Sequence, residues 1–196
     1  MKLLSGVGCV VFLLGLAAVP MAGEIKGVVT AAGMKTNADA VVYVDAIPGK
    51  TFPAPTTHAT MNQKNLVFTP HVLPVLQGTT VDFLNGDQVL HNVFSPDKCC
   101  ERFNLGSWPQ GQIRSYTFKT RCNATLLCKV HAEMEGFVVA LPTPWFAVTD
   151  KTGAYLIKDV PDGAYSVKVW HPKFKAESGK PVTVAGVTTA DFAMKK

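Results

Sequence analysis

The stretch Cys128-Lys-Val-His131-Ala-Glu-Met134, followed by the strand-like run Gly136-Phe-Val-Val-Ala-Leu141, decides how we interpret this sequence. A thiol, an imidazole and a thioether lie in one short segment that begins at the end of an expected strand. The loop to the next strand can turn these three side chains back toward one point. Two sulfur ligands with histidine suit copper, provided that a second histidine arrives from elsewhere in the fold.

The candidate for that second histidine is His91, in the short β-rich segment Val89-Leu-His-Asn-Val-Phe94. In an antiparallel sandwich this segment can reach the same end as Cys128. His91, Cys128 and His131 would then form a trigonal plane, with Met134 as a weak and long axial ligand. The competing interpretation is an ordinary buried cysteine near a core histidine, because a lone Cys-x-x-His pattern is weak by itself.

Composition indicates an all-β protein. The chain has 196 residues, 47% of them hydrophobic and 17% charged, which is typical of a compact globular protein with a real core. Helical periodicity is almost absent, and short runs rich in Val, Thr, Phe and Tyr alternate with Gly, Pro, Asn and Asp, which predicts a β sandwich. The segment 95–112 is polar and contains Gly and Pro, so we expect an excursion there. Strands are predicted at 25–30, 40–46, 65–68, 72–76, 79–84, 89–94, 113–118, 124–128, 137–141, 145–149, 154–157, 165–170, 182–184 and 188–194.

The N-terminus is typical of a secretory signal peptide. Residues 1–22 contain Lys2, an apolar run around 10–16 and small residues before Gly23. We therefore expect a protein that is periplasmic or otherwise exported, with no membrane span in the mature form. Removal of the signal lowers the formal net charge from +5 to +4. This modest excess favours acidic protein partners, and no arginine-rich run predicts nucleic-acid binding.

Two proline-containing breaks divide the remaining chain. Three prolines lie between positions 48 and 55, and two more at 142 and 144. The tail after the second break is small for an independent core, so its first strands are expected near the N-terminus, with the middle of the chain as an insertion. We predict a signal peptide at 1–22, the first strands of a flanking module at 23–49, a copper domain at 50–144 and the rest of the flanking module at 145–196.

Four cysteines remain after signal removal: Cys99, Cys100, Cys122 and Cys128. An exported protein can form disulfides. If Cys128 binds metal, at most one internal pair forms and one thiol is left over. We expect Cys122 to be bridged to Cys99 or Cys100, with Cys100–Cys122 as the working pair.

The middle of the chain resembles the cupredoxin family, and plastocyanin-like proteins in particular. The similarity covers about residues 60–141 and rests on Phe68-Thr-Pro70, Gly78-Thr-Thr-Val-Asp-Phe-Leu-Asn85, His91-Asn-Val-Phe94 and Cys128-Lys-Val-His131. It implies a Greek-key β sandwich that holds one copper ion at one end and shuttles single electrons. It also implies that Asn92 ties the ligand strands together and donates to the thiolate sulfur.

Met134 departs from the common plastocyanin spacing, in which four residues usually separate the histidine from the methionine. Here two residues separate His131 from Met134. Glu133, Glu135 or an open position are therefore alternatives to Met134 at the axial site.

The flanks resemble carboxypeptidase-regulatory-like, or transthyretin-type, sandwiches. The matching segments are Gly27-Val-Val-Thr30, Phe146-Ala-Val-Thr-Asp-Lys-Thr-Gly153, Val160-Pro-Asp-Gly-Ala-Tyr165 and Val169-Trp-His171. This resemblance implies a non-catalytic scaffold or interaction module.

Together these patterns predict an exported mononuclear blue-copper protein that carries one electron at a time between redox proteins, such as a cytochrome with an acidic surface. The alternatives are a periplasmic copper-binding or delivery protein without redox turnover, and a metal-free structural β module. We do not expect an enzyme, because no serine–histidine–acid arrangement, paired catalytic carboxylates or phosphate-binding loop is visible.

Overall fold

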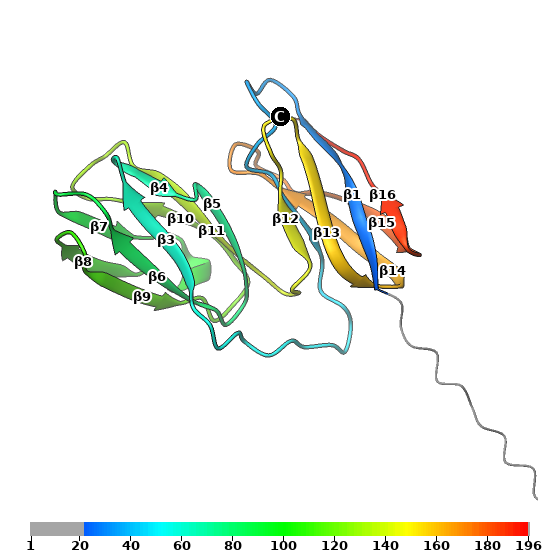
Figure 1. Ribbon diagram of the computed structural model, residues 1–196, viewed down its shortest axis with the longest axis horizontal. Helices are drawn as coiled ribbons and strands as arrows, with labels where there is room; N and C mark the ends of the chain where they lie inside the picture. Colours follow the sequence, from blue (N-terminus) through cyan, green and yellow to red (C-terminus); the bar gives the residue numbers. More distant parts are fainter. Residues whose placement is uncertain (1–21, 196) are drawn as a thin grey trace, which may run out of the picture.

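The computed structural model describes residues 22–195, which form two β-rich lobes (Figure 1). Across this range the only helical element is a short 3-10 turn, η1 (Lys98–Cys100). The predicted all-β fold is therefore confirmed. The signal peptide predicted at 1–22 lies, apart from its last residue, outside the described range. No helix among the described residues has the length and apolar character needed to cross a bilayer.

The first lobe is a sandwich of two sheets. One sheet has the order β5-β11-β10-β7-β8 and the other β4-β3-β6-β9. Its core contains Val93, Trp108 and Leu126 from the first sheet and Met61 and Phe83 from the second. The strand bounds are β3 (Ala59–Lys64), β4 (Val67–Thr69), β5 (Val72–Leu76), β6 (Thr80–Asn85), β7 (His91–Phe94), β8 (Asn104–Trp108), β9 (Ile113–Thr117), β10 (Cys122–Leu127) and β11 (Glu135–Leu141).

The second lobe combines strands from both ends of the chain. Strand β1 pairs with β13, β16 and β17, and strand β2 lies between β12 and β14, which pairs with β15. A separate apolar cluster joins the two sheets and includes Ile25, Val42 and Val167. The bounds are β1 (Ala22–Ala31), β2 (Val41–Val44), β12 (Phe146–Val148), β13 (Ala154–Pro161), β14 (Gly163–Trp170), β15 (Ser178–Val184), β16 (Val187–Thr189) and β17 (Phe192–Met194).

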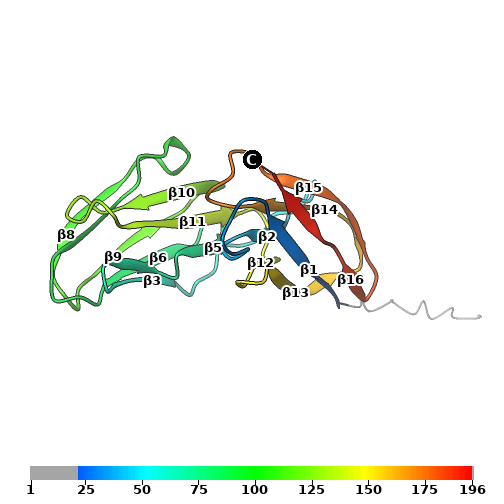
Figure 2. The ribbon, with the colours of Figure 1, turned by 90° about the horizontal axis from the view of Figure 1, so that it is seen from above.

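A third apolar cluster joins the lobes through β2 and β11. Val41 and Tyr43 of β2 pack with Phe137, Val139 and Leu141 of β11 in this cluster. Because successive side chains of a strand point to opposite faces, the alternate residues of both strands fill the cores of their own lobes. Both strands are thus covered on two faces, which explains why their sequences are continuous apolar runs. Figure 2 shows these inner strands between the lobes.

A polar network centred on Arg121 adds to this contact. Its guanidinium donates to Asp45 and Glu177, each at 3.1 Å, and to the hydroxyl of Tyr43 at 2.6 Å. The Tyr43 hydroxyl in turn donates to Glu177 at 2.8 Å. Burial of Tyr43 and its hydrogen bond to Glu177 raise the pKa of Tyr43, so the hydroxyl keeps its proton. Arg121 immediately precedes β10, so the network connects a strand of the first lobe to the second.

The expected excursion at 95–112 is only partly correct. The segment contains η1 and also strand β8, which pairs with β7 through His91–Trp108 and Asn92–Ser107. Gly106 adopts a positive φ of 74°, and the register shifts between Asn92 and Phe94. This irregular pairing accommodates Gly106. A glycine inside a strand weakens the strand pattern, so β8 was not predicted from the sequence.

Candidate metal centre

The structure brings three of the four predicted ligands together. His91 begins β7, Cys128 directly follows β10, and His131 lies in the loop between β10 and β11. One potential ligand atom from each residue lies within 4.8 Å of the others. The Cys128 Sγ atom is 3.9 Å from Nδ1 of His131, and the two imidazole rings have centroids 4.8 Å apart. Cys128 is a free thiol, so its sulfur is available to a metal.

The loop from 128 to 134 folds back locally. The backbone N–H of Met134 donates to the carbonyl of His131 at 3.1 Å, which closes a tight turn before β11 begins. Strand β11 then pairs with β10 along the whole length of β10, from Cys122–Ala140 to Leu127–Glu135. The short hairpin connection therefore holds Cys128 and His131 at the same end of the sandwich.

His91 has the chemistry of a prepared metal ligand. Its side chain is completely buried, and its Nε2 lies 2.9 Å from Oδ2 of Asp87. Its Nδ1 is buried and has no hydrogen-bond partner. The carboxylate fixes the tautomer in which Nε2 carries the proton and Nδ1 presents a lone pair. A buried polar atom without a partner is rare in native proteins, and a metal ion in this cluster would satisfy it.

Asp87 was not predicted from the sequence, although it orients His91. Burial opposes ionisation of Asp87, but the N–H groups of Leu66 and Asn65 and the ring of His91 outweigh it and lower the pKa of the carboxyl to about 2. The N–H groups donate at 3.0 and 2.8 Å. The only sequence signal is an acidic residue in the turn that leads to the histidine strand.

Asn92 ties together the segments that carry the ligands. Its side-chain carbonyl accepts from the N–H of Lys129 at 3.2 Å, and its amide donates to Asn104 and to the carbonyl of Gly106. The donor to the Cys128 sulfur is the backbone N–H of Asn92, at 3.4 Å. The resemblance implied both tasks for Asn92, and the structure divides them between its side chain and its main chain.

Met134 lies in the core cluster that also contains Cys128, and it is only 1% exposed. Of the two acidic alternatives, Glu133 is exposed, and Glu135 accepts a hydrogen bond from Lys173 at 2.9 Å. The burial of the thioether is consistent with an axial role. That role remains a prediction.

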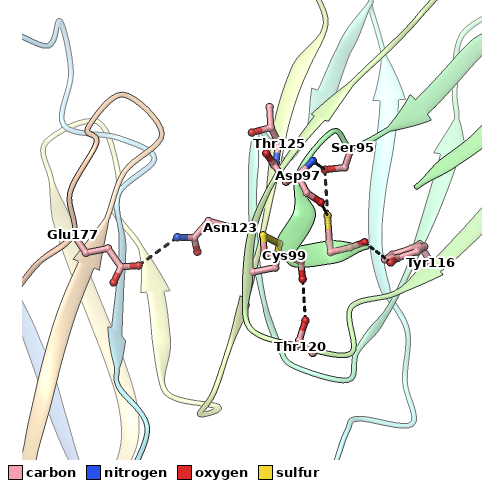
Figure 3. The surroundings of a disulfide bond; sticks show 10 residues. Ser95, Asp97, Cys99, Tyr116, Thr120, Asn123, Thr125 and Glu177 are labelled. Carbon is pink, nitrogen blue, oxygen red and sulfur yellow. Dashed lines mark hydrogen bonds between the residues drawn. A yellow bond between two sulfur atoms is a disulfide. The ribbon is translucent and has the colours of Figure 1, made fainter. Parts of the chain in front are cut away.

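The disulfide joins Cys99 to Cys122, so the working pair Cys100–Cys122 is wrong. Cys99 and Cys100 are neighbours in η1, and sequence alone does not distinguish which sulfur the turn directs toward β10. Cys100 is a buried free thiol. It donates to the hydroxyl of Ser95 and to the carbonyl of Asp97 (Figure 3).

The other histidines bind protein groups. Asp82 lies 3.0 Å from His58, and Asp39 lies 2.8 Å from His71. His171 contacts the carbonyl of Ala38 at 3.1 Å. None of these three histidines belongs to the cluster of His91, Cys128 and His131.

No family model matches the sequence, and a search of curated proteins found no match. Among solved structures, a copper-containing nitrite reductase from Thermus scotoductus is 22% identical over 51% of this chain, with a TM-score of 0.43. This chain covers only 25% of the length of that reductase. A purple cupredoxin from Nitrosopumilus maritimus is 24% identical over 42% of this chain and 98% of its own, with a TM-score of 0.38.

A reduced amicyanin variant is 20% identical over 52% of this chain and 98% of its own, with a TM-score of 0.41. Similarities of this level say nothing of the ligand or activity of this chain. The two-sheet sandwich with His91, Cys128 and His131 at one end is nevertheless the cupredoxin-like arrangement expected from the sequence.

Proposed function

We propose that this chain is an exported one-electron carrier that holds a single type 1 copper ion through His91, Cys128, His131 and Met134. The observation that supports this most strongly is the buried and unpartnered Nδ1 of His91 within the three-residue cluster. Two imidazoles, a thiolate and a distant thioether form the donor set that suits such an ion.

Copper, when bound, supplies the one-electron Cu(I)/Cu(II) couple. The residues around it hold the ligands in place. Asp87 fixes the ring of His91, and the N–H of Asn92 supports the sulfur of Cys128. His91 and Cys128 are buried in a packed core, which keeps water away and limits movement of the ligands. A site that changes little between two oxidation states favours fast electron transfer.

The surface beside the cluster suits a transient protein partner. Leu90 precedes His91 and Val130 precedes His131, and their side chains are 52% and 47% exposed. His131 itself is only partly buried. Exposed apolar residues beside such a site favour docking of another protein. We propose a redox protein such as a cytochrome as this partner, with an acidic surface that complements the positive net charge of the chain.

We further propose that the second lobe is a carboxypeptidase-regulatory-like module that serves as a scaffold, and that the protein works in the periplasm or another exported location. The contact through β2 and β11 supports a rigid attachment of this lobe to the copper lobe. The sequence of residues 1–22 supports export.

The test is electron exchange between the copper-loaded protein and a soluble cytochrome c with an acidic surface, followed by stopped-flow absorbance. We expect reversible reduction and reoxidation without loss of copper. Val130→Asp should slow the exchange, whereas Val187→Asp, a similarly exposed position in the other lobe, should not. Transfer of the copper to a Cu(I) acceptor, without reversible cycling, would favour the delivery function instead.

A further inference from the structure

A second cluster of sulfur atoms lies where η1 meets the beginning of β10. The Sγ atoms of Cys99, Cys100 and Cys122 all lie within 4.8 Å of one another. Two of them form the disulfide, and the third is the buried thiol of Cys100. A structural disulfide needs only two cysteines, so the position of the Cys100 sulfur beside it calls for another explanation.

The backbone on both sides of this cluster is anchored independently of the disulfide. The hydroxyl of Tyr116 donates to the carbonyl of Cys100 at 2.6 Å, and Thr120 donates to the carbonyl of Cys99 at 2.9 Å (Figure 3). The carboxylate of Asp97 accepts from the N–H of Thr125 in β10 at 2.6 Å. These three hydrogen bonds connect η1 to β9, to the segment before β10 and to β10 itself. The sulfurs should therefore stay close together when the disulfide is opened.

Three thiolates at this spacing fit a soft metal ion. Metal–thiolate distances near 2.3 Å place the sulfurs of a trigonal site about 4.0 Å apart, which is inside the observed limit. Thiolate ligands select Cu(I) and Zn(II) over harder ions. Three sulfurs without a fourth ligand favour Cu(I), because structural zinc sites are almost always four-coordinate.

We propose that reduction of the Cys99–Cys122 disulfide converts this cluster into a three-thiolate binding site for Cu(I), distinct from the site at His91. A dithiol reductant supplies two electrons and two protons and is itself oxidised to a disulfide. Cys99 and Cys122 become thiols. Cu(I) then displaces three protons from the three thiols, and the metal keeps its oxidation state.

The surface offers access to this cluster. A hollow of about 320 Å³ is lined by Cys99, Arg121, Cys122, Asn123 and Glu177. Cys99 is exposed, so a reductant and the metal ion can approach from this side. The proposal therefore meets the requirements of ligand number, spacing, support and access.

The test uses the full-length Cys128→Ser variant, which lacks the thiolate of the other site. Its Cu(I) binding is measured anaerobically against a chromogenic Cu(I) chelator, before and after reduction with a dithiol that is then removed. We expect reduction to add one tightly bound Cu(I) per chain, beyond any ion that the oxidised variant holds at the remaining ligands His91, His131 and Met134. Sulfur coordination in X-ray absorption should correspond to three thiolates.

The matched control is the double variant Cys100→Ser, Cys128→Ser, in which a hydroxyl can keep the hydrogen bond to Asp97. Its affinity after reduction should be at least about tenfold weaker. Equal affinity with and without the Cys100 thiol, or no binding after reduction, would overturn the proposal. Loss of the β-sheet circular dichroism signal in the reduced, Cu(I)-loaded variant would overturn it as well. Oxidised wild-type protein tests the His91 site separately, so either site can fail without the other.

Discussion

Replacement of Asp87 by alanine tests how the protein prepares His91 for a metal. The carboxylate contacts Nε2 of His91 at 2.9 Å and accepts the N–H groups of Asn65 and Leu66. Asn65 and Leu66 are exposed, so water can replace the carboxylate at their N–H groups at small cost. His91 is completely buried, so its ring has no such substitute. The main effect of Asp87→Ala should therefore fall on His91.

The expected size follows from two separate considerations. A buried donor left without a partner costs about 1–3 kcal/mol. Loss of the group that orients a metal-binding histidine typically weakens metal affinity by about 10–100-fold. At about 1.4 kcal/mol for each factor of ten, that loss corresponds to about 1.4–2.8 kcal/mol of metal-binding free energy, whereas the first range refers to the stability of the folded protein.

The assay is a competition titration of copper against a chelator of known affinity, on wild type and on Asp87→Ala. Asp82→Ala is the matched control, because Asp82 contacts His58 at 3.0 Å in the same lobe but outside the cluster. We expect its copper affinity to stay within about twofold of wild type. If Asp87→Ala binds copper as tightly as Asp82→Ala, the orientation of His91 by its carboxylate does not matter and our reasoning is refuted.

Three further predictions concern stability. The hydrogen bond to Asp39 raises the pKa of His71 above its ordinary value of 6.5. Protonated His71 therefore stabilises the folded protein fully below pH 6.5, and this stabilisation is lost as the pH rises through the raised pKa. The same bond lowers the pKa of Asp39 below 3.8, so the stabilisation by ionised Asp39 is lost in acid. The melting temperature of wild type should therefore exceed that of His71→Ala most between pH 4 and 6.5. A difference that does not change with pH would contradict this. Arg121→Ala should lower the free energy of unfolding by about 1 kcal/mol in urea denaturation, because its ion pairs are partly solvent-screened, and no loss would show that the network is unimportant. Gly136→Ala should cost about 1–3 kcal/mol, since its Cβ would lie 2.7 Å from Cβ of Phe68, and an unchanged denaturation midpoint would rule out this close packing.

The fold was predictable where one physical signal dominated. The run at 136–141 is apolar throughout, and β11 is covered on both faces, by its own core and by β2. Strand β3 was missed because its sequence, Ala59-Thr-Met-Asn-Gln-Lys64, is mostly polar. Only Met61 and Gln63 of β3 are fully buried, and its parallel pairing with β6 stabilises it. Such tertiary support leaves no local pattern in the sequence.

The candidate site was predictable to a similar extent. His91, Cys128 and His131 could be grouped because their spacing fits strands that share one end. Asp87 could not, because its contact with His91 depends on the conformation of the turn before β7. The choice between Cys99 and Cys100 likewise depends on the conformation of η1 and of the two residues after it, Glu101 and Arg102, which both take positive φ. Turn geometry of this kind is decided by contacts that spacing alone does not reveal.

The central claim is that the thiolate of Cys128 binds copper together with two histidines. The most direct measurement is the visible and electron paramagnetic resonance spectrum of the purified protein loaded with Cu(II), recorded beside Cys128→Ser and His171→Ala. We expect an intense thiolate-to-copper charge-transfer band in wild type and His171→Ala, and none in Cys128→Ser. A colourless copper-loaded protein, or a band that persists without the Cys128 sulfur, would contradict the claim.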